Sequence, residues 1–498
     1  MSKRLELIWP DKDKVLLGLD ENGKPIWGTK ADLETRLLVQ LDAIGETSAD
    51  NLNDLYEQGD NLLIKGDNLL ALKALEQHFA GKIKCIYIDP PFNTGNAFEY
   101  YDDGLEHTIW LSMMKGRLEI LRKLLREDGA IFVHIDYNEE PYLRVLMDEV
   151  FGRTNYRNTI IVSRVRKNIR ERERVKALNF GHGPILFYAK SENTVIEPPT
   201  FTQEKGERWH AFDAPGIRPT MEYKLFGYDP PKGRHWMFEE AKAREMIAKG
   251  ELRQNPRTGK PQYRLAPSSE TMFDTLWTDV QESAFNWGLQ GGEKSEKLIH
   301  RILQMVTSPG DWVLDSFLGS GTTAAVAHKM GRKWIGVEMG EHAETLCLPR
   351  LKLAVRGEDQ TGISRQVGWK GGGGFRYCVL GESLFDKDED TGLVMINPKY
   401  TNGPLVAAVC NLEDFNLNDD SIFHGVRGNM YAHVAEDKVT QAYLDALVEK
   451  LPHGKNLVVY YLKRATGLEV PQEVKVKRIP KELQIPRYLT SASRGGGE

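Results

Sequence analysis

Short apolar runs alternate with helix-like segments in two separated stretches of this 498-residue chain. In the first stretch, the β-branched run Ile83–Ile88 precedes a helix expected over residues 110–125. In the second, a strand over residues 312–314 leads through a glycine-rich turn into a helix over residues 324–330, and another strand follows at 333–337. Strands separated by helices of this length are typical of a parallel sheet. The alternation therefore predicts an α/β fold.

Composition excludes several classes of protein. The chain has 66 Lys and Arg against 71 Asp and Glu, a net charge of −5, so a uniformly basic nucleic-acid binder is excluded. No apolar run approaches the roughly 20 residues of a membrane span, and the first residues lack the apolar stretch of a secretory signal. The four cysteines form no C-x-x-C pair, which argues against a disulfide framework or a zinc site. We expect a cytoplasmic protein of roughly two to four domains, with no membrane association and no metal.

The glycine-rich turn predicts a cofactor site. It reads Asp315-Ser-Phe317-Leu-Gly319-Ser-Gly321 directly after a strand, and glycine there lets the backbone approach a ligand closely. Glu338 ends the next strand, close to the roughly 20 residues of spacing at which an acid binds ribose hydroxyls. A third glycine of the dinucleotide type and a triphosphate-binding loop are both absent from the sequence. The pattern favours an adenosine-bearing cofactor without a long phosphate chain over an ordinary strand–helix turn.

A second motif, Asp89-Pro90-Pro91-Phe92, follows the strand Ile83–Ile88. The Asp89 carboxylate and the Pro90 carbonyl are both acceptors, and proline has no N–H to compete with them. Two such acceptors can hold the hydrogens of an aromatic amine, while Phe92 offers a stacking face. The two prolines restrict the backbone and place these groups in advance. The alternative is a rigid turn without chemical meaning.

These two motifs resemble those of amino-directed DNA methyltransferases that use S-adenosylmethionine. Residues 89–92 are similar to the family's D-P-P-[YFW] catalytic motif, and residues 315–321 to its F-x-G-x-G cofactor motif. The catalytic motif comes first, which is the order of the β group. Longer matches at residues 89–95, 134–136 and 368–377 are similar to modification subunits of type III restriction systems and their stand-alone relatives. The resemblance implies a doubly wound, Rossmann-like methyltransferase sheet.

The resemblance also implies roles for individual residues. Asp89, Pro90, Pro91 and Phe92 would grip and stack a target base turned out of double-stranded DNA. An initial Asp rather than Ser implies the N6 amino group of adenine. The cofactor's ribose would be held by Glu338 and its carboxylate by Lys294, while Asp315 would order the loop or contact the cofactor's amino group. The cofactor would also be lined by residues of the glycine-rich turn: Phe317, Gly319, Gly321 and Thr322.

Two positions depart from the family pattern. Phe92 stands where tyrosine is commoner, and stacking survives this change. Gly181-His182-Gly183 stands where relatives often have an Asp-His pair, so the sequence does not show how the outer face of the target base is closed. Methyl transfer from a sulfonium is an in-line displacement that needs placement of the nitrogen rather than a metal or a covalent nucleophile. We therefore expect structural or DNA-backbone roles for His134, His182 and His300.

The region between the motifs is basic. Residues 151–270 contain 23 Lys and Arg against 14 Asp and Glu. Such cations supply salt-dependent affinity for phosphates, and some can read guanine edges. We expect DNA contacts there, and the alternative for this run is a solvated helix face. The candidate DNA-binding residues are Arg164, Arg166, Lys167 and Arg170.

We expect five segments along the chain. They are an N-terminal extension with one amphipathic helix near 31–44 (1–58), the catalytic half of the core (59–152), a mixed target-recognition insert (153–285), the cofactor half (286–368), and a glycine linker at 371–374 with a separate C-terminal α+β domain (369–498). The last segment is the candidate for forming a homodimer or for docking a helicase–nuclease restriction subunit.

Other functions stay open at this point. A cytosine-N4 enzyme is the nearest alternative. A methyltransferase for RNA or for a protein side-chain amide usually has an Asn-initiated motif and lacks a large basic insert. A non-catalytic DNA-recognition subunit of a nuclease is the alternative from another class, and the intact motifs argue against it.

Overall fold

The computed structural model describes residues 5–20, 23–47, 59–93, 106–164, 181–284, 287, 293–387, 393–400, 404–418 and 422–483. The chain divides into two compact units, Met1–Glu197 together with Thr275–Glu498, and Pro198–Asp274. Among the described residues, no helix is long and apolar enough to cross a membrane.

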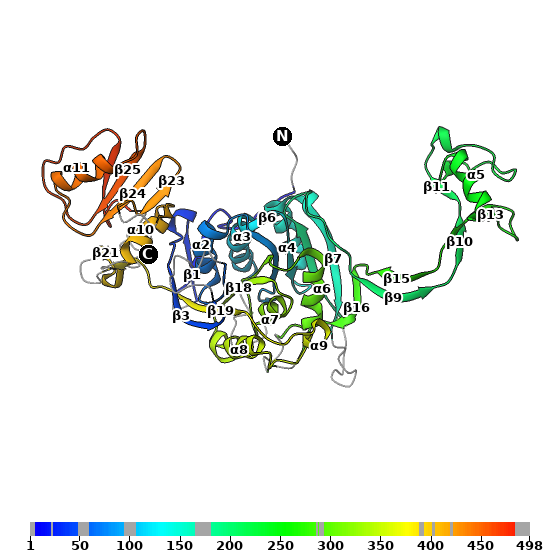
Figure 1. The fold of residues 1–498 in the computed structure, drawn as a ribbon, viewed down its shortest axis with the longest axis horizontal. Coiled ribbons are helices and arrows are strands. Elements are labelled where there is room, and N and C mark those ends of the chain that lie inside the picture. Colours follow the sequence, from blue (N-terminus) through cyan, green and yellow to red (C-terminus); the bar gives the residue numbers. More distant parts are fainter. Residues whose placement is uncertain are drawn as a thin grey trace. The chain divides into compact units, whose positions relative to one another are not determined.

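A ten-stranded sheet forms the centre of the first unit (Figure 1). The strands from β6 to β19 run parallel, whereas β8 and β3 are antiparallel to their neighbours. In spatial order the strands are β16 (Leu276–Gln281), β7 (Tyr156–Ser163), β8 (His182–Ala189), β6 (Leu125–His134), β5 (Ile83–Ile88), β17 (Trp312–Asp315), β18 (Lys333–Glu338), β4 (Asn61–Lys65), β19 (Gly374–Leu380) and β3 (Leu38–Gly45).

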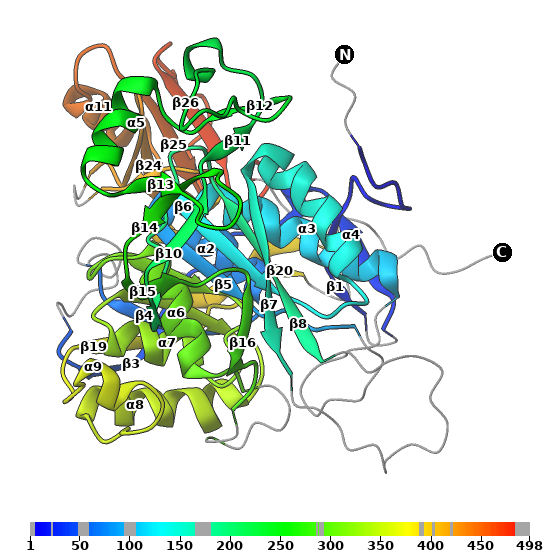
Figure 2. The ribbon, with the colours of Figure 1, turned by 90° about the vertical axis from the view of Figure 1, so that its right-hand side faces the viewer.

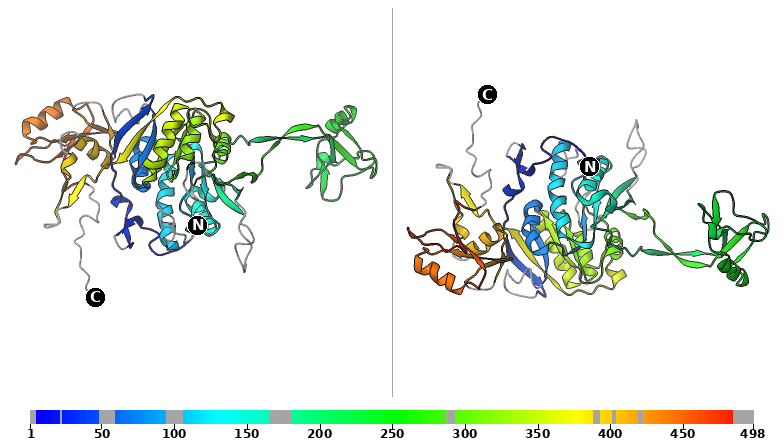
Figure 3. Two further views of the ribbon diagram at one scale, coloured as in Figure 1. Left: turned by 90° about the horizontal axis from the view of Figure 1, so that it is seen from below. Right: turned by 90° about the horizontal axis from the view of Figure 1, so that it is seen from above.

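Helices cover both faces of this sheet (Figures 2 and 3). The six residues of β5 are all buried, as is usual for a central parallel strand that is packed on both sides. One group of helices is α2 (Asn68–Phe79), α3 (His107–Leu124) and α4 (Glu140–Met147), and the other is α6 (Glu296–Val306), α7 (Thr322–Lys329) and α8 (Leu348–Arg356). The predicted α/β, doubly wound fold is confirmed.

Smaller elements complete the first unit before its C-terminal part. They are β1 (Val15–Leu19) paired with β2 (Pro25–Gly28), α9 (Ser364–Val367), β20 (Phe385–Lys387) paired with β21 (Val394–Ile396), and short π- or 3-10 turns at η1 (Lys30–Asp32), η2 (Asp148–Gly152), η3 (Arg153–Asn155), η6 (Ala343–Cys347) and η7 (Pro398–Tyr400).

Two local predictions were wrong, and both errors concern the edge of the main sheet. The helix expected near residues 31–44 is instead strand β3, because pairing with β19 overrides a weak local helical preference. The glycines at 371–374 are not a linker. A Cβ on Gly374 would lie 2.4 Å from the carbonyl oxygen of Ile44. Gly371 has a φ of +95°, and a Cβ on it would lie 2.7 Å from the amide nitrogen of Gly357. These glycines let the chain pass close to neighbouring backbone and enter β19.

The C-terminal residues form a second sheet within the first unit, although a separate domain from residue 369 was expected. The boundary differs because residues 374–380 are a strand of the main sheet. The smaller sheet has its own apolar clusters, built around Val409 and Tyr460 on one side and Leu444 and Val459 on the other. Its elements are β22 (Asn416–Leu417), β23 (Gly425–Arg427), β24 (Met430–Ala435), β25 (Asn456–Tyr461) and β26 (Val474–Arg478), with α10 (Pro404–Leu412) and α11 (Gln441–Lys450).

The second unit, residues 198–274, is narrower than the insert expected over 153–285. Strands β7, β8 and β16 lie within that expected range but pair into the main sheet. A small core around Phe212 and Trp236 holds the unit together. Its elements are β9 (Thr200–Lys205) paired with β15 (Ser268–Met272), the sheet β10 (Arg208–Ala211), β14 (Pro261–Leu265) and β13 (Leu252–Gln254), the pair β11 (Asp213–Pro215) and β12 (Arg234–Trp236), η5 (Pro219–Met221) and α5 (Glu240–Ala248).

Candidate active site

The two motifs lie side by side at one edge of the main sheet. Strand β5 ends at Ile88, just before Asp89, and its parallel neighbour β17 ends at Asp315. From β5 the chain continues to β6 on one side, and from β17 to β18 on the other. Ligands of open α/β sheets bind at such a switch point, outside the carboxyl ends of the strands. The fold therefore brings together the two loops that the sequence singled out.

Asp89 offers one carboxylate oxygen to this edge. Its Oδ2 lies 3.0 Å from Nζ of Lys294. Its Oδ1 is buried and has no hydrogen-bond partner among the residues that the structure describes. The Pro91 carbonyl accepts a 2.9 Å hydrogen bond from the indole N–H of Trp110, which fixes the loop. A buried acceptor without a donor suits an N–H group of a ligand.

Phe92 has two cations near its ring. Nζ of Lys294 is 4.8 Å and Cζ of Arg164 is 5.3 Å from the ring centroid. The imidazole of His134 lies 6.1 Å away in a tilted arrangement, and its Nδ1 is 3.0 Å from the hydroxyl of Tyr87. Phe92 is partly exposed and packs against the main core. Its surroundings suit a stacking surface beside Asp89.

The glycine-rich turn is held in place by two carboxylates. Asp315 accepts hydrogen bonds from the Phe317 amide at 3.0 Å and the Thr323 hydroxyl at 2.6 Å, and burial raises the pKa of Asp315 to about 7. The carboxylate of Glu338 accepts hydrogen bonds from the backbone amides of Gly319, at 2.8 Å, and Gly340, at 2.9 Å. Asp315 therefore orders the loop, which is one of the two roles considered for it.

The backbone of the turn needs its glycines. Gly319 has a φ of +58° and Gly321 a φ of +82°, and Gly321 is the residue before α7. The side chain of Ser316 contributes a buried hydroxyl without a hydrogen-bond partner among the described residues. Glycine adopts this left-handed conformation without the strain of a Cβ, so the turn keeps its backbone amides at the sheet edge.

A pocket of about 380 Å³ lies beyond Glu338 on the same edge. Met339, the next residue after Glu338, lines it together with Gly66 and Asp67, which follow β4. The Gly66 amide donates a 3.0 Å hydrogen bond to the Glu338 carbonyl, so the two loops are joined. The pocket is therefore lined by the residue that directly follows the predicted ribose-binding acid.

Lys294 connects the two motifs. Its carbonyl accepts a 3.3 Å hydrogen bond from the hydroxyl of Thr322, the first residue of α7. Its buried ammonium group pairs with Asp89 and with Glu282, at 3.0 and 3.4 Å. Burial opposes the charge, but the two carboxylates outweigh it and raise the pKa of Lys294. The residue predicted to hold a cofactor carboxylate therefore also contacts the predicted catalytic acid.

The sequence matches the DNA methylase family of N6 and N4 methyltransferases over residues 83–347, which is more than half of the chain. The match includes both motifs and Lys294. The chain belongs to the DNA methylase family. The predicted resemblance to amino-directed DNA methyltransferases is confirmed.

Curated relatives of this methylase come from restriction–modification systems. A probable type III restriction–modification enzyme Mod subunit of Haemophilus influenzae is 33% identical over 404 residues, covering 64% of this chain and 54% of the relative. The type II methyltransferase M.EcaI of Enterobacter cloacae is 30% identical over 321 residues, covering 59% of this chain and 70% of the relative. The methylase thus spans about half the length of the type III relative.

A solved structure of a putative DNA modification methylase from Thermus thermophilus is similar to 65% of this chain and 100% of its own, with 16% sequence identity and a TM-score of 0.36.

Arg164 of the methylase is engaged by carboxylates. Its Nε lies 2.6 Å from Glu282 and its Nη1 2.7 Å from Asp136. The other predicted DNA-binding residues, Arg166, Lys167 and Arg170, lie outside the described residues. The prediction that Arg164 contacts DNA stays a prediction, but its charge is already paired.

Glu282 is a residue of this site that was not predicted from the sequence. A Cβ on Gly183 would lie 2.5 Å from Oε2 of Glu282 and 2.8 Å from Nε2 of His134. Glu282 and His134 therefore occupy the space beside the Gly181-His182-Gly183 segment, where relatives often have an Asp-His pair. No local motif marks Glu282, because it follows an edge strand that looked like the end of the insert. The burial of Glu282 at the end of β16 emerges only from the fold.

Proposed function

We propose that this methylase transfers a methyl group from S-adenosylmethionine to the N6 amino group of an adenine turned out of double-stranded DNA, at a specific site. One observation carries the proposal. The loop beginning at Asp89 lies beside the turn at 315–321, and Oδ1 of Asp89 is buried there without a donor among the described residues. The similarity to a type III Mod subunit supports a role in a restriction–modification or related defence system.

The residues present fit S-adenosylmethionine. The glycines at 319 and 321 have left-handed backbones that bring amides close to a ligand, and Glu338 is a buried acid on the next strand. The 380 Å³ pocket at Met339 suits the adenosine end. Lys294 has three N–H donors, of which two face Asp89 and Glu282, so a third is available to a carboxylate. When bound, the cofactor supplies a methyl group on a sulfonium.

The chain's own groups then act by placement. Asp89 Oδ1 and the Pro90 carbonyl accept the two hydrogens of the amino group, so the nitrogen lone pair turns from the ring toward the methyl donor. Phe92 stacks on the base. The negative charge of Asp89 favours the positive charge that develops on the nitrogen before its proton leaves. Turning the base out of the helix costs a few kcal/mol in lost stacking and pairing.

An assay of the modified base tests the reaction. The purified protein is incubated with labelled S-adenosylmethionine and plasmid DNA, and the nucleosides are separated after digestion. N6-methyladenine is expected, and Asp89→Ala, which removes the acceptor, serves as the inactive control. N4-methylcytosine would identify the cytosine-N4 enzyme instead. If DNA of diverse sequence gives no labelled nucleoside, the non-catalytic DNA-recognition subunit is the remaining alternative.

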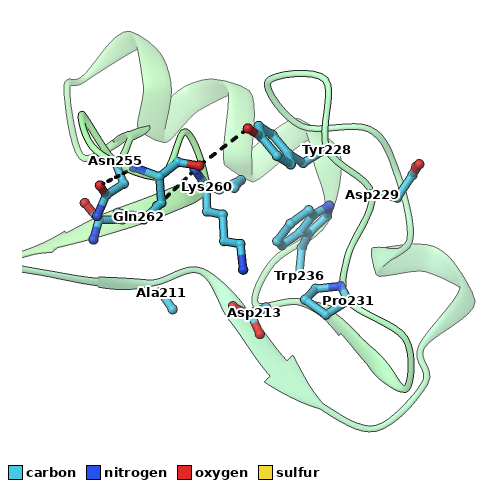
Figure 4. A pocket seen from close by; sticks show the side chains of 11 residues that line it. Ala211, Asp213, Tyr228, Asp229, Pro231, Trp236, Asn255, Lys260 and Gln262 are labelled. Carbon is cyan, nitrogen blue, oxygen red and sulfur yellow. Dashed lines mark hydrogen bonds between the residues drawn. The ribbon is translucent and has the colours of Figure 1, made fainter.

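We propose that residues 198–274 contribute to target recognition. Arg253 lies 3.7 Å over the ring of Trp209, and neither Arg253 nor Lys260 has a carboxylate partner among the described residues. Lys260 extends into a pocket of about 150 Å³ with Gln262 and Trp236 at its walls (Figure 4). Unpaired cations beside aromatic and amide side chains suit phosphates and base edges.

A substitution pair tests this role. Arg253→Gln with Lys260→Gln should weaken DNA binding and lower its salt slope, whereas Lys242→Gln, whose charge is paired with Glu245 on α5, serves as the control. Equal affinity and slope in all three proteins would remove this unit from the DNA interface.

Oligomeric state is a further proposal. We propose that the C-terminal sheet, residues 404–483, forms a homodimer or docks a helicase–nuclease restriction subunit. Its support is a sheet with its own apolar clusters, outside the strands that form the catalytic edge. Light scattering of the full chain, compared with a truncation that keeps β19 and ends after Lys387, tests it. A dimer in both proteins would place the contact elsewhere.

A further inference from the structure

Glu282 stands at the centre of a buried ionic network below Phe92. It is 5% exposed and directly follows β16. Its Oε1 lies 3.4 Å from Nζ of Lys294, and its Oε2 lies 2.6 Å from Nε of Arg164 and 3.7 Å from Nε2 of His134. Burial opposes ionisation of Glu282, but Lys294, followed by His134 and Arg164, holds its pKa well below the usual range.

The backbone of Glu282 is fixed as well. Its amide donates a 2.9 Å hydrogen bond to the Ser163 carbonyl, and its carbonyl accepts one of 3.0 Å from the Ser295 amide. Ser283 forms an isolated β-bridge with Lys294. The segment that carries Glu282 is therefore joined to the segment that carries Lys294, and the distance between the two side chains is set by the fold.

Three carboxylates in this network share two Lys or Arg side chains, with the His134 imidazole beside Glu282. Asp89, Asp136 and Glu282 are acids, whereas Lys294 and Arg164 are the only Lys or Arg side chains among the described residues that pair with them. The ammonium group of Lys294 is shared by two carboxylates, so it does not neutralise Asp89 alone. Asp89 therefore keeps acceptor strength at Oδ1, which lacks a donor among the described residues.

We infer that Glu282 is a positioning residue for methyl transfer, acting through Lys294. It holds the ammonium group 3.0 Å from Oδ2 of Asp89 while sharing its charge, so that Oδ1 stays a free acceptor for the target amine. This inference rests on the proposed function. Since the third N–H of Lys294 suits the cofactor's carboxylate, Glu282 also couples the position of Asp89 to that of the methyl donor.

The test compares Glu282→Gln with a control on the preceding strand. Gln has nearly the same shape, but it is neutral and has an NH2 donor in place of one carboxylate oxygen. Asp279→Asn removes a carboxylate that pairs with Arg301 at 2.6 Å, is half exposed, and lies away from Asp89. For each protein we would measure the single-turnover rate against pH, the cofactor Kd, the DNA Kd and the Tm.

Glu282→Gln should lower the single-turnover rate by about 10- to 100-fold, since small displacements of reacting groups have effects of this size. DNA affinity should change little. The basic limb of the rate profile should move to lower pH, because Glu282 is one of the two carboxylates that raise the pKa of Lys294. The other groups facing this site stay in place: Tyr87, His134, Asp136, Arg164, Lys294 and Asp315.

A wild-type rate and pH profile in folded Glu282→Gln would overturn the inference, as would a lower Tm with an unmoved pH profile. If Glu282→Gln does not fold, Gly183→Ala decides the question. Its methyl group would meet Oε2 of Glu282 at 2.5 Å and displace the carboxylate without changing charge. We expect a lower rate, and an unchanged rate would refute the role. An inactive wild-type protein would instead count against the proposed function.

Discussion

Nζ of Lys294 lies 3.0 Å from Oδ2 of Asp89, although the two residues come from segments on either side of the insert. Lys294 is also tied through its carbonyl to Thr322 at the start of α7. One residue, through its side chain and its carbonyl, therefore joins the loop after β5 to the start of α7 after the glycine-rich turn.

Asp89→Ala should lower methyl transfer by at least about 10²-fold, because the acceptor that favours charge on the amine is lost. Cofactor affinity should largely persist, since Glu338 and the glycine turn are untouched. Rate measurements with a cofactor titration check both points. Retained turnover would remove Asp89 from the reaction.

Glu338→Gln should weaken cofactor binding more than DNA binding. Hydrogen bonds to a charged group contribute about 1.5–3 kcal/mol, so the cofactor Kd should rise roughly 10- to 100-fold. Because Glu338 also accepts the amides of Gly319 and Gly340, the Tm is measured in parallel. An unchanged cofactor titration would contradict the ribose assignment.

Salt dependence should separate Arg164 from its neighbours in sequence. Replacing Arg166 and Lys167 by Gln should reduce the slope of log affinity against log salt by up to about 1.8, at about 0.9 for each phosphate contact. Arg164→Gln should leave this slope unchanged, because Glu282 and Asp136 already hold the guanidinium. Filter binding between about 50 and about 200 mM salt measures all three. If Arg164→Gln reduces the slope of log affinity against log salt, Arg164 contacts DNA.

The buried carboxyl of Asp315 predicts a pH-dependent stability. Its pKa is raised to about 7 in the folded protein, so the folded state holds the proton more tightly than the unfolded state. The stability that the folded state gains from this proton is fully present below the ordinary pKa of Asp, and it is lost as pH rises to about 7. Asp315→Asn should therefore gain stability relative to wild type, on the order of 4 kcal/mol, between about pH 4 and 7. A Tm difference that is constant across this range would refute the assignment.

Gly374→Ala should destabilise the protein by about 2–4 kcal/mol, because the new Cβ would meet the carbonyl oxygens of Ile44 and Glu46 at 2.4 and 2.5 Å. Gly18→Ala is the matched control, since nothing lies within 4 Å of the added atom. Urea unfolding of both variants checks the difference. If the two variants unfold at the same urea concentration, residues 371–374 are better interpreted as a linker.

Local patterns determined much of this protein. The buried run Ile83–Ile88, the acid and prolines after it, and the glycines after β17 each specify a strand end with defined acceptors and backbone freedom. Parallel pairing then places those ends at one edge of a sheet, so the α/β fold and the position of both motifs follow from the amino-acid sequence.

Tertiary structure decided the features that depend on pairing between distant segments. Residues 38–45 form a strand because they pair with β19. Residues 371–374 must be glycine-rich because neighbouring backbone lies within contact distance of them. Glu282 and Arg164 look like ordinary charged residues in the sequence. Only folding buries Glu282 and brings Arg164 to it beside Lys294 and Asp89, where low solvent exposure makes the charge of Glu282 depend on its partners.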